Sequence, residues 1–316
     1  MNKHLRLTGL LAGAIMVAAA CSSTGASTAP SVAPSTAPSE AASVAPTDAP
    51  SATVDPASLL GQILKTGTIR VATDPNYAPF SFLNTTTNEY EGFDTSTAVE
   101  TVKRLSEKLG TEIKLQWETP GWDTITAGSW GGRWDISIGS MSVTVGREKV
   151  VDFTAPYYYD SGSVAVMKDS PIQSLSELDG GKTFCVGTAT TYEQWLTGTL
   201  EIVDPTMKSA PTDPQITALP TDNECIQAVQ AGRTYDAIVA NSNGLQDAVA
   251  KGAPIRILEG PPIFTVSVAF ALDKSGPNTA GLKAILDEIV LDMHKDGTLK
   301  GFSQEWLKQD VTTKPE

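Results

Sequence analysis

From about residue 57 to its C-terminal end, the chain alternates strand-like patterns with amphipathic helix patterns. Residues 68–74 are rich in β-formers, residues 95–109 carry apolar side chains at helical spacing, and residues 112–117 alternate strictly between apolar and polar. Strands that alternate with helices are typical of parallel α/β layers. The pattern resumes in a second unit, with strands at 183–186 and 236–240 and helices at 223–231 and 242–251. The chain then returns to a strand at 265–272 and two helices at 278–295 and 299–308. We therefore expect an α/β fold.

The first 20 residues have the pattern of a secretory signal. Lys3 and Arg6 precede an apolar run, 7–20, which is too short to span a membrane comfortably and ends in small residues. The run ends in three alanines before Cys21, which resembles the lipobox of bacterial lipoproteins. We expect residues 1–20 to be removed and Cys21 to be lipidated. The alternative is an ordinary signal peptide with a chance cysteine.

Residues 21–56 consist almost wholly of Ala, Ser, Thr, Pro and Val. This segment has no apolar periodicity and too little bulk to bury, so we expect a disordered linker between the lipidated cysteine and the folded part. About 260 residues remain, which is enough for two modest domains.

The formal net charge of the whole chain is −13. Such acidity argues against nucleic acid as a partner, and against anionic membrane surfaces. Contact with a membrane is expected through the lipid anchor only.

Two cysteines remain besides the one at position 21. Cys185 and Cys225 form an even pair in a secreted chain, which favours a disulfide over two buried thiols. No histidine is near them and they lack Cys-x-x-Cys spacing, so they do not indicate a zinc site. We expect no metal and no cofactor.

Two loops that follow strands carry side chains suited to a small cation and to a carboxylate. The loop 73–80 offers Asp74 with the aromatic Tyr77 and Phe80, which suits a small cation. The loop 139–147 offers two hydroxyls and a following arginine, which suits a carboxylate; these residues are Ser140, Ser142 and Arg147. The structural alternatives are a packed turn with a capping Asp and a surface ion pair of the arginine.

A third loop, 187–191, ends in the capping pattern Thr190-Thr191-Tyr192-Glu193, which predicts a helix start. The free N–H groups of a helix start favour an anion, although many such ends cap only themselves.

The order of these loops resembles that of a known family. TDPNYAPF, YEGFD, WDTITAG, RWDISIGSMSVTVGREKVVDFTAPYY, GKTFCVGTATTYEQW, AGRTYDAIVAN and HKDGTLKGFSQEWL occur in this order. Together they are similar to the polar amino-acid family of solute-binding proteins of ABC transporters. The similarity extends from about residue 59 to residue 307.

The resemblance implies a type II periplasmic-binding-protein fold, in which two lobes are joined by two hinge strands. Lobe 1 would comprise residues 57–160 and 267–316, and lobe 2 residues 161–266. The hinge strands would lie at 163–167 and 265–270. The resemblance implies a monomer that works outside the cytoplasm. Its function would be to deliver an amino acid or close analogue to the transmembrane subunits of an ABC permease.

The resemblance also implies roles for individual residues. Ser140, Ser142 and Arg147 would hold the α-carboxylate from lobe 1, and Thr191 at the predicted helix start, next to Thr190, would hold it from lobe 2. Asp74 would face the α-ammonium. Tyr77, Phe80 and, through a less direct alignment, Trp122 would wall the pocket.

One departure from the family pattern bears on how the solute is held. The family commonly ends the strand DA-x-x-x-D with an acid that pairs with the ammonium, whereas here the strand ends in Asn241. An amide oxygen accepts a hydrogen bond but supplies no charge, so Asp74 would have to suffice or the solute would differ from a standard α-amino acid.

Two other functions are compatible with the same residues. Cyclohexadienyl dehydratases resemble this family, but they need a general acid or base, and the two histidines, His4 and His294, lie in the signal and in a terminal helix pattern. Glu118 and Glu193 are the acids nearest the expected cleft. The other alternative is a tethered sensor that docks onto a membrane receptor. Of these functions, we expect a binding protein and no enzyme.

Overall fold

The structure, a computed structural model, describes residues 54–314. The predicted signal peptide, Cys21 and nearly all of the predicted linker lie outside the described residues. The strands are β1 (Thr68–Ala72), β2 (Asn76–Tyr77), β3 (Ser81–Asn84), β4 (Glu89–Glu91), β5 (Lys114–Glu118), β6 (Ile136–Ser137), β7 (Val151–Met167), β8 (Thr183–Gly187), β9 (Gln215–Leu219), β10 (Ala237–Asn241), β11 (Ile255–Ile257) and β12 (Phe264–Asp273). The helices are α1 (Leu59–Thr66), α2 (Phe93–Leu109), α3 (Trp122–Thr126), α4 (Thr191–Leu196), α5 (Asp222–Gln230), α6 (Ser242–Ala250), α7 (Ala280–Lys295) and α8 (Thr298–Leu307).

Nine of these strands form one mixed sheet, in the order β5-β1-β6-β12-β7-β10-β8-β9, with β11 on the side of β7. The outer pairs β1/β5, β1/β6, β8/β10 and β8/β9 are parallel. The central pairs that involve β7 or β12 are antiparallel. Each end of the sheet is therefore a parallel βα unit, as the alternating pattern predicts, and β7 and β12 connect the two ends.

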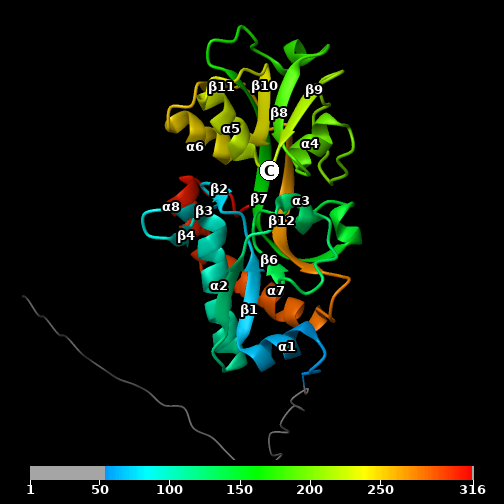
Figure 1. Ribbon diagram of the computed structural model, residues 1–316, viewed down its shortest axis with the longest axis vertical. Helices are drawn as coiled ribbons and strands as arrows, with labels where there is room; N and C mark the ends of the chain where they lie inside the picture. The colour runs from blue at the N-terminus through cyan, green and yellow to red at the C-terminus, as the bar shows by residue number, and fades with distance from the viewer. Residues whose placement is uncertain (1–53, 315–316) are drawn as a thin grey trace, which may run out of the picture. The chain divides into compact units, whose positions relative to one another are not determined.

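The hydrophobic core is divided in the same way. One set of clusters joins β1, β6, α1, α2, α7 and α8, which we call the first lobe. Another set joins β8, β10, α4, α5 and α6, which we call the second lobe. In Figure 1 these groups lie at opposite ends of β7 and β12, which run from one group to the other. This is the expected α/β architecture of type II periplasmic binding proteins.

The two long strands pair along most of their length, from Phe264 opposite Gly162 to Asp273 opposite Val151. In β7 the side chains up to Tyr158 belong to the first-lobe core, and those from Val164 onward belong to the second. The point at which β7 passes from the first lobe to the second therefore lies a few residues before the predicted hinge segment 163–167. That segment is the stretch with the clearest strand pattern, whereas the preceding run of tyrosines gives no alternation.

A second, three-stranded sheet of β2, β3 and β4 was not expected from the sequence. Its strands are two to four residues long and mostly half-exposed, so they produce no apolar periodicity. It follows directly on the loop that carries Asp74 and so belongs to the wall of the region described below.

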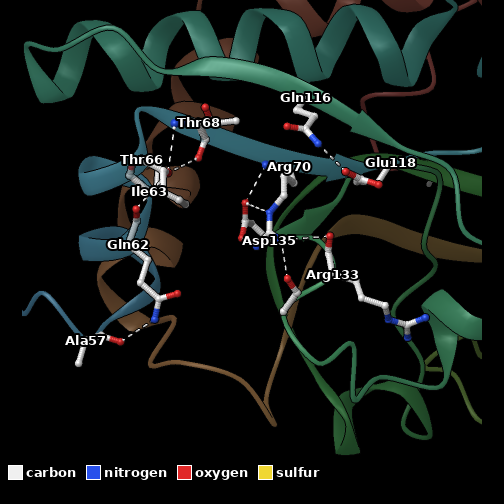
Figure 2. A network of polar contacts seen from close by, with 11 residues as sticks. Ala57, Gln62, Ile63, Thr66, Thr68, Arg70, Gln116, Glu118, Arg133 and Asp135 are labelled. Atoms are coloured by element: carbon white, nitrogen blue, oxygen red, sulfur yellow. Dashed lines mark hydrogen bonds and ion pairs between the residues drawn. The ribbon is translucent and has the colours of Figure 1, made fainter.

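The edge of the first lobe is fixed by an ion pair between Arg70 of β1 and Asp135, just before β6. The guanidinium donates from Nη2 to Oδ1 at 2.6 Å and from Nε to Oδ2 at 3.2 Å, and the Arg70 backbone N–H also donates to Oδ2. Figure 2 shows this pair in its network with the start of β1 and the end of α1. The contact joins segments 65 residues apart and holds β1, whose C-terminal end leads into the Asp74 loop.

Cys185 and Cys225 form a disulfide, as the sequence predicts. It ties β8 to α5 in the core of the second lobe, where both cysteines are fully buried. Within residues 54–314, no helix is long and apolar enough to cross a membrane.

Candidate functional site

A cavity lined by residues of both lobes lies beside β7. Eight of the ten residues predicted as ligand contacts line it: Asp74, Tyr77, Trp122, Ser140, Ser142, Arg147, Thr190 and Thr191. The other lining residues are Gly139, Asp160, Tyr192, Pro220, Thr221 and Asp222.

Arg147 begins a short 3-10 helix in the first lobe and is 4% exposed. Its guanidinium lies over the Trp122 ring, 5.3 Å from the ring centre. Nη1 donates to the Ser142 carbonyl and Nη2 to the Ala189 carbonyl of the second lobe, each at 3.0 Å. Nε has no hydrogen-bond partner among the described residues. Burial lowers the pKa of Arg147 to about 10, so this guanidinium remains charged near neutral pH.

The two serines of the same loop differ in availability. The Ser140 hydroxyl donates to the Asp94 carboxylate at 2.7 Å and accepts from the Tyr158 hydroxyl at 2.8 Å. Ser142 is buried at the cavity, and its hydroxyl makes no hydrogen bond to any described residue. Ser142 is therefore free to bind a solute, whereas the Ser140 hydroxyl is already occupied in the wall.

In the second lobe, the capping pattern forms as predicted. The Thr190 hydroxyl accepts from the Glu193 backbone N–H, and the Glu193 carboxylate accepts from the Ala189 N–H at 2.6 Å. Ala189 has a positive φ of 59°, a conformation that usually favours glycine, so the alanine keeps the loop shape at some strain. Thr191 begins α4 and is buried at the cavity wall. Together, Arg147, Ser142 and Thr191 form what we call the arginine side of the cavity.

Phe80 is not part of the lining, contrary to the prediction. Its ring is fully buried between Tyr77 and Tyr158, with centroid separations of 5.3 and 5.6 Å. The tight turn after Asp74 directs Tyr77 to the cavity and Phe80 to the core. Phe80 thus supports the wall from behind.

Asn241, the position where the family pattern has an acid, also lies outside the lining. Its side-chain oxygen accepts from the backbone N–H groups of Asn243 and Gly244, which caps α6. Its amide nitrogen donates to Asp160 at 2.5 Å. The asparagine therefore holds a neighbouring carboxylate in place.

Asp160, in β7, lines the cavity although it was not among the ligand contacts predicted from the sequence. It is 4% exposed and accepts hydrogen bonds from the Tyr192 hydroxyl at 2.7 Å and from Asn241. Burial raises its pKa to about 6, although these two donors and Arg147 favour the ionised form. The available signal was a lone carboxylate in an aromatic stretch, YYYDSG.

Asp222, the first residue of α5, was missed as well. One carboxylate oxygen, Oδ1, accepts from the Gly187 N–H at 2.8 Å, and the side chain is 4% exposed. Burial raises its pKa to about 7, and repulsion from Asp160 and Asp74 adds to the effect. In sequence, an acid behind Thr221 resembles an ordinary residue of a helix first turn. We call Asp74, Asp160 and Asp222 the acidic side of the cavity.

Direct hydrogen bonds join the lobes around the cavity. The Val145 N–H donates to the Glu201 carbonyl at 3.1 Å, and Asn223 of α5 donates from its side chain to the carbonyls of Asn76 and Ala78. With the contact from Arg147 to Ala189, these bonds hold the lobes closed over the cavity.

The arrangement combines one buried guanidinium with three carboxylates, which suits a small solute that carries both a carboxylate and cationic nitrogen. Among the described residues, no group of three or more His, Cys, Asp or Glu side chains is placed to hold a metal ion.

Comparisons with known proteins agree with the fold. Residues 69–309 match the model of the bacterial extracellular solute-binding proteins, family 3. The L-cystine-binding protein TcyJ of Escherichia coli (strain K12) is 30% identical over 257 residues, which are 80% of this chain and 88% of that protein. The crystal structure of AncCDT-1, an ancestral amino acid-binding protein and precursor of cyclohexadienyl dehydratase, is 28% identical with a TM-score of 0.66, covering 79% of this chain and 100% of that one.

A cyclohexadienyl dehydratase of Pseudomonas aeruginosa is 31% identical over 147 residues, 46% of this chain and 52% of that protein. TcyJ, in contrast, aligns over most of its length and is named as a binding protein. The chain belongs to the bacterial extracellular solute-binding proteins, family 3.

Proposed function

We propose that this protein captures an amino acid or a close analogue outside the cytoplasm and delivers it to an ABC permease. The observation that carries the proposal is the buried guanidinium of Arg147, whose Nε has no partner among the described residues, in a cavity that Asp160 also lines. A buried arginine with unused N–H groups binds a carboxylate strongly, because the pair forms away from water.

In this proposal the arginine side holds the α-carboxylate. Arg147 and the Ser142 hydroxyl bind it from the first lobe and Thr191 binds it from the second. Thr190 keeps the loop in shape, and Ser140 positions the wall through Asp94. Tyr77 and Trp122 cover the solute. On the other side, Asp160 takes the place expected for an acid at position 241 and pairs with the α-ammonium.

The two lobes would close around the solute by bending at β7 and β12. We retain the predicted division into residues 57–160 and 267–316 for one lobe and 161–266 for the other. Because Arg147 contacts Ala189 across the cavity, a carboxylate that binds Arg147 also reaches the second lobe, and the solute then favours the closed state.

The lipid anchor at Cys21 is part of the same proposal. A tethered binding protein stays near its permease, and a linker of the composition of residues 21–56 would permit it to reach the permease and return. Mass spectrometry of the protein from its host membrane would detect a diacylglyceryl group at Cys21, and a free N-terminus elsewhere would contradict it.

Thermal unfolding of the purified protein against a panel of amino acids tests the binding function. A solute that binds only the folded protein raises the melting temperature with its concentration, by several degrees at a hundredfold excess over Kd. The variant Arg147→Met should lose this response. If no amino acid shifts the melting temperature or binds in equilibrium dialysis, the proposed function is wrong.

A dehydratase is the second candidate, because two carboxyl groups in the cavity have a pKa near neutrality, as an acid-base catalyst requires. Of the acids expected from sequence, Glu193 caps its own loop and Glu118 accepts from Gln116, and neither lines the cavity. Prephenate carries two carboxylates, which a cavity with three acids and one arginine disfavours. Incubation with prephenate or arogenate should therefore yield no aromatic product, and its appearance would favour the enzyme.

A further inference from the structure

The charges that line the cavity do not balance for a neutral amino acid. The lining holds three carboxylates, Asp74, Asp160 and Asp222, and a single cationic side chain, Arg147. None of the three acids makes an ion pair with another side chain of the described residues. An unpaired ionised carboxylate is costly at such a site, so a solute that brings positive charge is favoured there.

The carboxylates also have unused acceptor positions. Asp222 receives one backbone N–H, from Gly187, on Oδ1, and Asp74 receives one, from Asn76, on Oδ1. No described residue donates a hydrogen bond to the second oxygen of either acid. Together with the partnerless Nε of the nearly fully buried Arg147, these oxygens are groups at the cavity that only a solute or water can satisfy.

The surroundings of the three acids indicate which part of a solute each one binds. Arg147 favours the ionised form of Asp160, whereas both Asp160 and Asp74 repel Asp222. The carboxylate and ammonium of an α-amino acid are attached to one carbon, so the acid near the arginine is the one that reaches the ammonium. Asp74 and Asp222, which repel each other, remain for a different group.

We propose that the solute carries a second cationic group on its side chain, as arginine, lysine and ornithine do, and that Asp74 and Asp222 bind it. This inference rests on the proposed function and narrows it to a class of solute. A solute with a neutral side chain would leave Asp74 and Asp222 as two uncompensated like charges at the cavity. A solute with two carboxylates and a single ammonium, such as glutamate, would need a second cation that the described lining does not contain.

Matched pairs of ligands test the inference directly. Arginine and citrulline have nearly the same shape, but only arginine carries a charge at the end of its side chain, and lysine and norleucine form a similar pair. Isothermal titration calorimetry on the full-length protein at pH 8 should give at least 100-fold tighter binding of the charged member in one of the two pairs. Glutamine and glutamate should also bind at least 100-fold more weakly than the preferred basic amino acid.

The outcomes separate this inference from the proposed function. If a neutral or acidic amino acid binds as tightly as the best basic one, the inference is overturned while the binding function stands. If no amino acid binds, both fail.

Variants locate the charge preference in the cavity. Asp222→Asn keeps an acceptor for the Gly187 N–H but removes the charge, and it should reduce the arginine-to-citrulline or lysine-to-norleucine ratio at least tenfold. Asp74→Asn should act in the same direction. The control is Asp247→Asn, which removes an acid of α6 that pairs with Lys251 away from the cavity, and it should leave the ratio unchanged. Unchanged ratios in both cavity variants, with the fold intact by circular dichroism, would overturn the assignment.

Discussion

The arginine side and the acidic side of the cavity are assembled from the chain in different ways. Ser142 and Arg147 lie five residues apart in one loop, and only Thr191 comes from the other lobe. The acidic side draws one residue each from the loop after β1, from β7 and from the start of α5. The first can be recognised from sequence because it is local, whereas the second exists only once three distant segments have packed together.

The electrostatics of the two sides differ as well. Arg147 is stabilised by two carbonyl groups and the Trp122 ring, so it keeps its charge despite burial. Asp160 and Asp222 have a raised pKa, since burial disfavours their ionised form. We therefore expect a solute to find the arginine side already charged. On the acidic side, we expect binding of the solute to favour loss of the remaining protons from Asp160 and Asp222.

The largest effect is expected from Arg147→Met, which removes the only cation of the lining. Affinity for the solute should fall about 1000-fold, since the loss of one partner of a buried charge pair costs roughly 2–5 kcal/mol. Isothermal titration calorimetry measures the change, and Arg133→Lys, which alters an arginine over Trp134 outside the cavity, is the matched control. Affinity within threefold of the wild type would show that the carboxylate binds elsewhere.

Removal of the disulfide should weaken the support of the acidic side. Cys185 lies two residues before Gly187, which donates to Asp222, and Cys225 lies in α5. The double variant C185A/C225A should lose about 2–4 kcal/mol in the free energy of unfolding. Urea unfolding measures the loss, with reduced wild-type protein as the comparison. Equal stability of the oxidised wild type and the double variant would indicate that the bond does not form.

Exchanging the side chains of residues 160 and 241 tests whether the ammonium binds at Asp160, as proposed, or at position 241, as in the family pattern. Asp160→Asn should weaken binding of every amino acid about 30-fold, since one charged partner of the ammonium is lost. The double variant D160N/N241D should restore the hydrogen-bonded pair and the stability, but not the affinity, because position 241 does not line the cavity. Recovery of the affinity would instead place the cation site at residue 241.

The pH dependence should have opposite signs for stability and for binding. Burial raises the pKa of Asp160 to about 6 and of Asp222 to about 7, so the protonated forms stabilise the solute-free fold at low pH. This contribution is lost as pH rises through 6 to 7, and the melting temperature of the solute-free protein should fall from pH 5 to pH 8.

A cationic solute binds the ionised acids, so its affinity should rise about tenfold over the same range, with release of protons near pH 6–7. Calorimetry in buffers of different ionisation enthalpy detects the protons. An affinity that falls from pH 5 to pH 8 would contradict the role of these acids.

Much of the architecture follows from local patterns. The helical spacing of apolar residues after residue 95 gives α2, although the helix begins at Phe93, and it ends before Gly110 in the left-handed conformation as expected. The alternation at 112–117 gives β5, shifted by one to two residues. The short strands β2–β4 have no such pattern, and the crossing point of β7 is set by which core each side chain enters. Periodicity reports a buried face but not the partner that buries it.

The sequence by itself determined the α/β class, the pairing of Cys185 with Cys225 as the default, and the loop that holds Arg147. These depend on residues close in the chain or on cysteine number. Only the tertiary structure decided that Phe80 and Asn241 stand behind the cavity while Asp160 and Asp222 face it. The reason is that an acid in a strand or at a helix start looks the same in sequence whether it meets water or a cavity. In the folded protein, burial and the residues that the sheet order places next to such an acid shift its pKa and allow it to bind a solute.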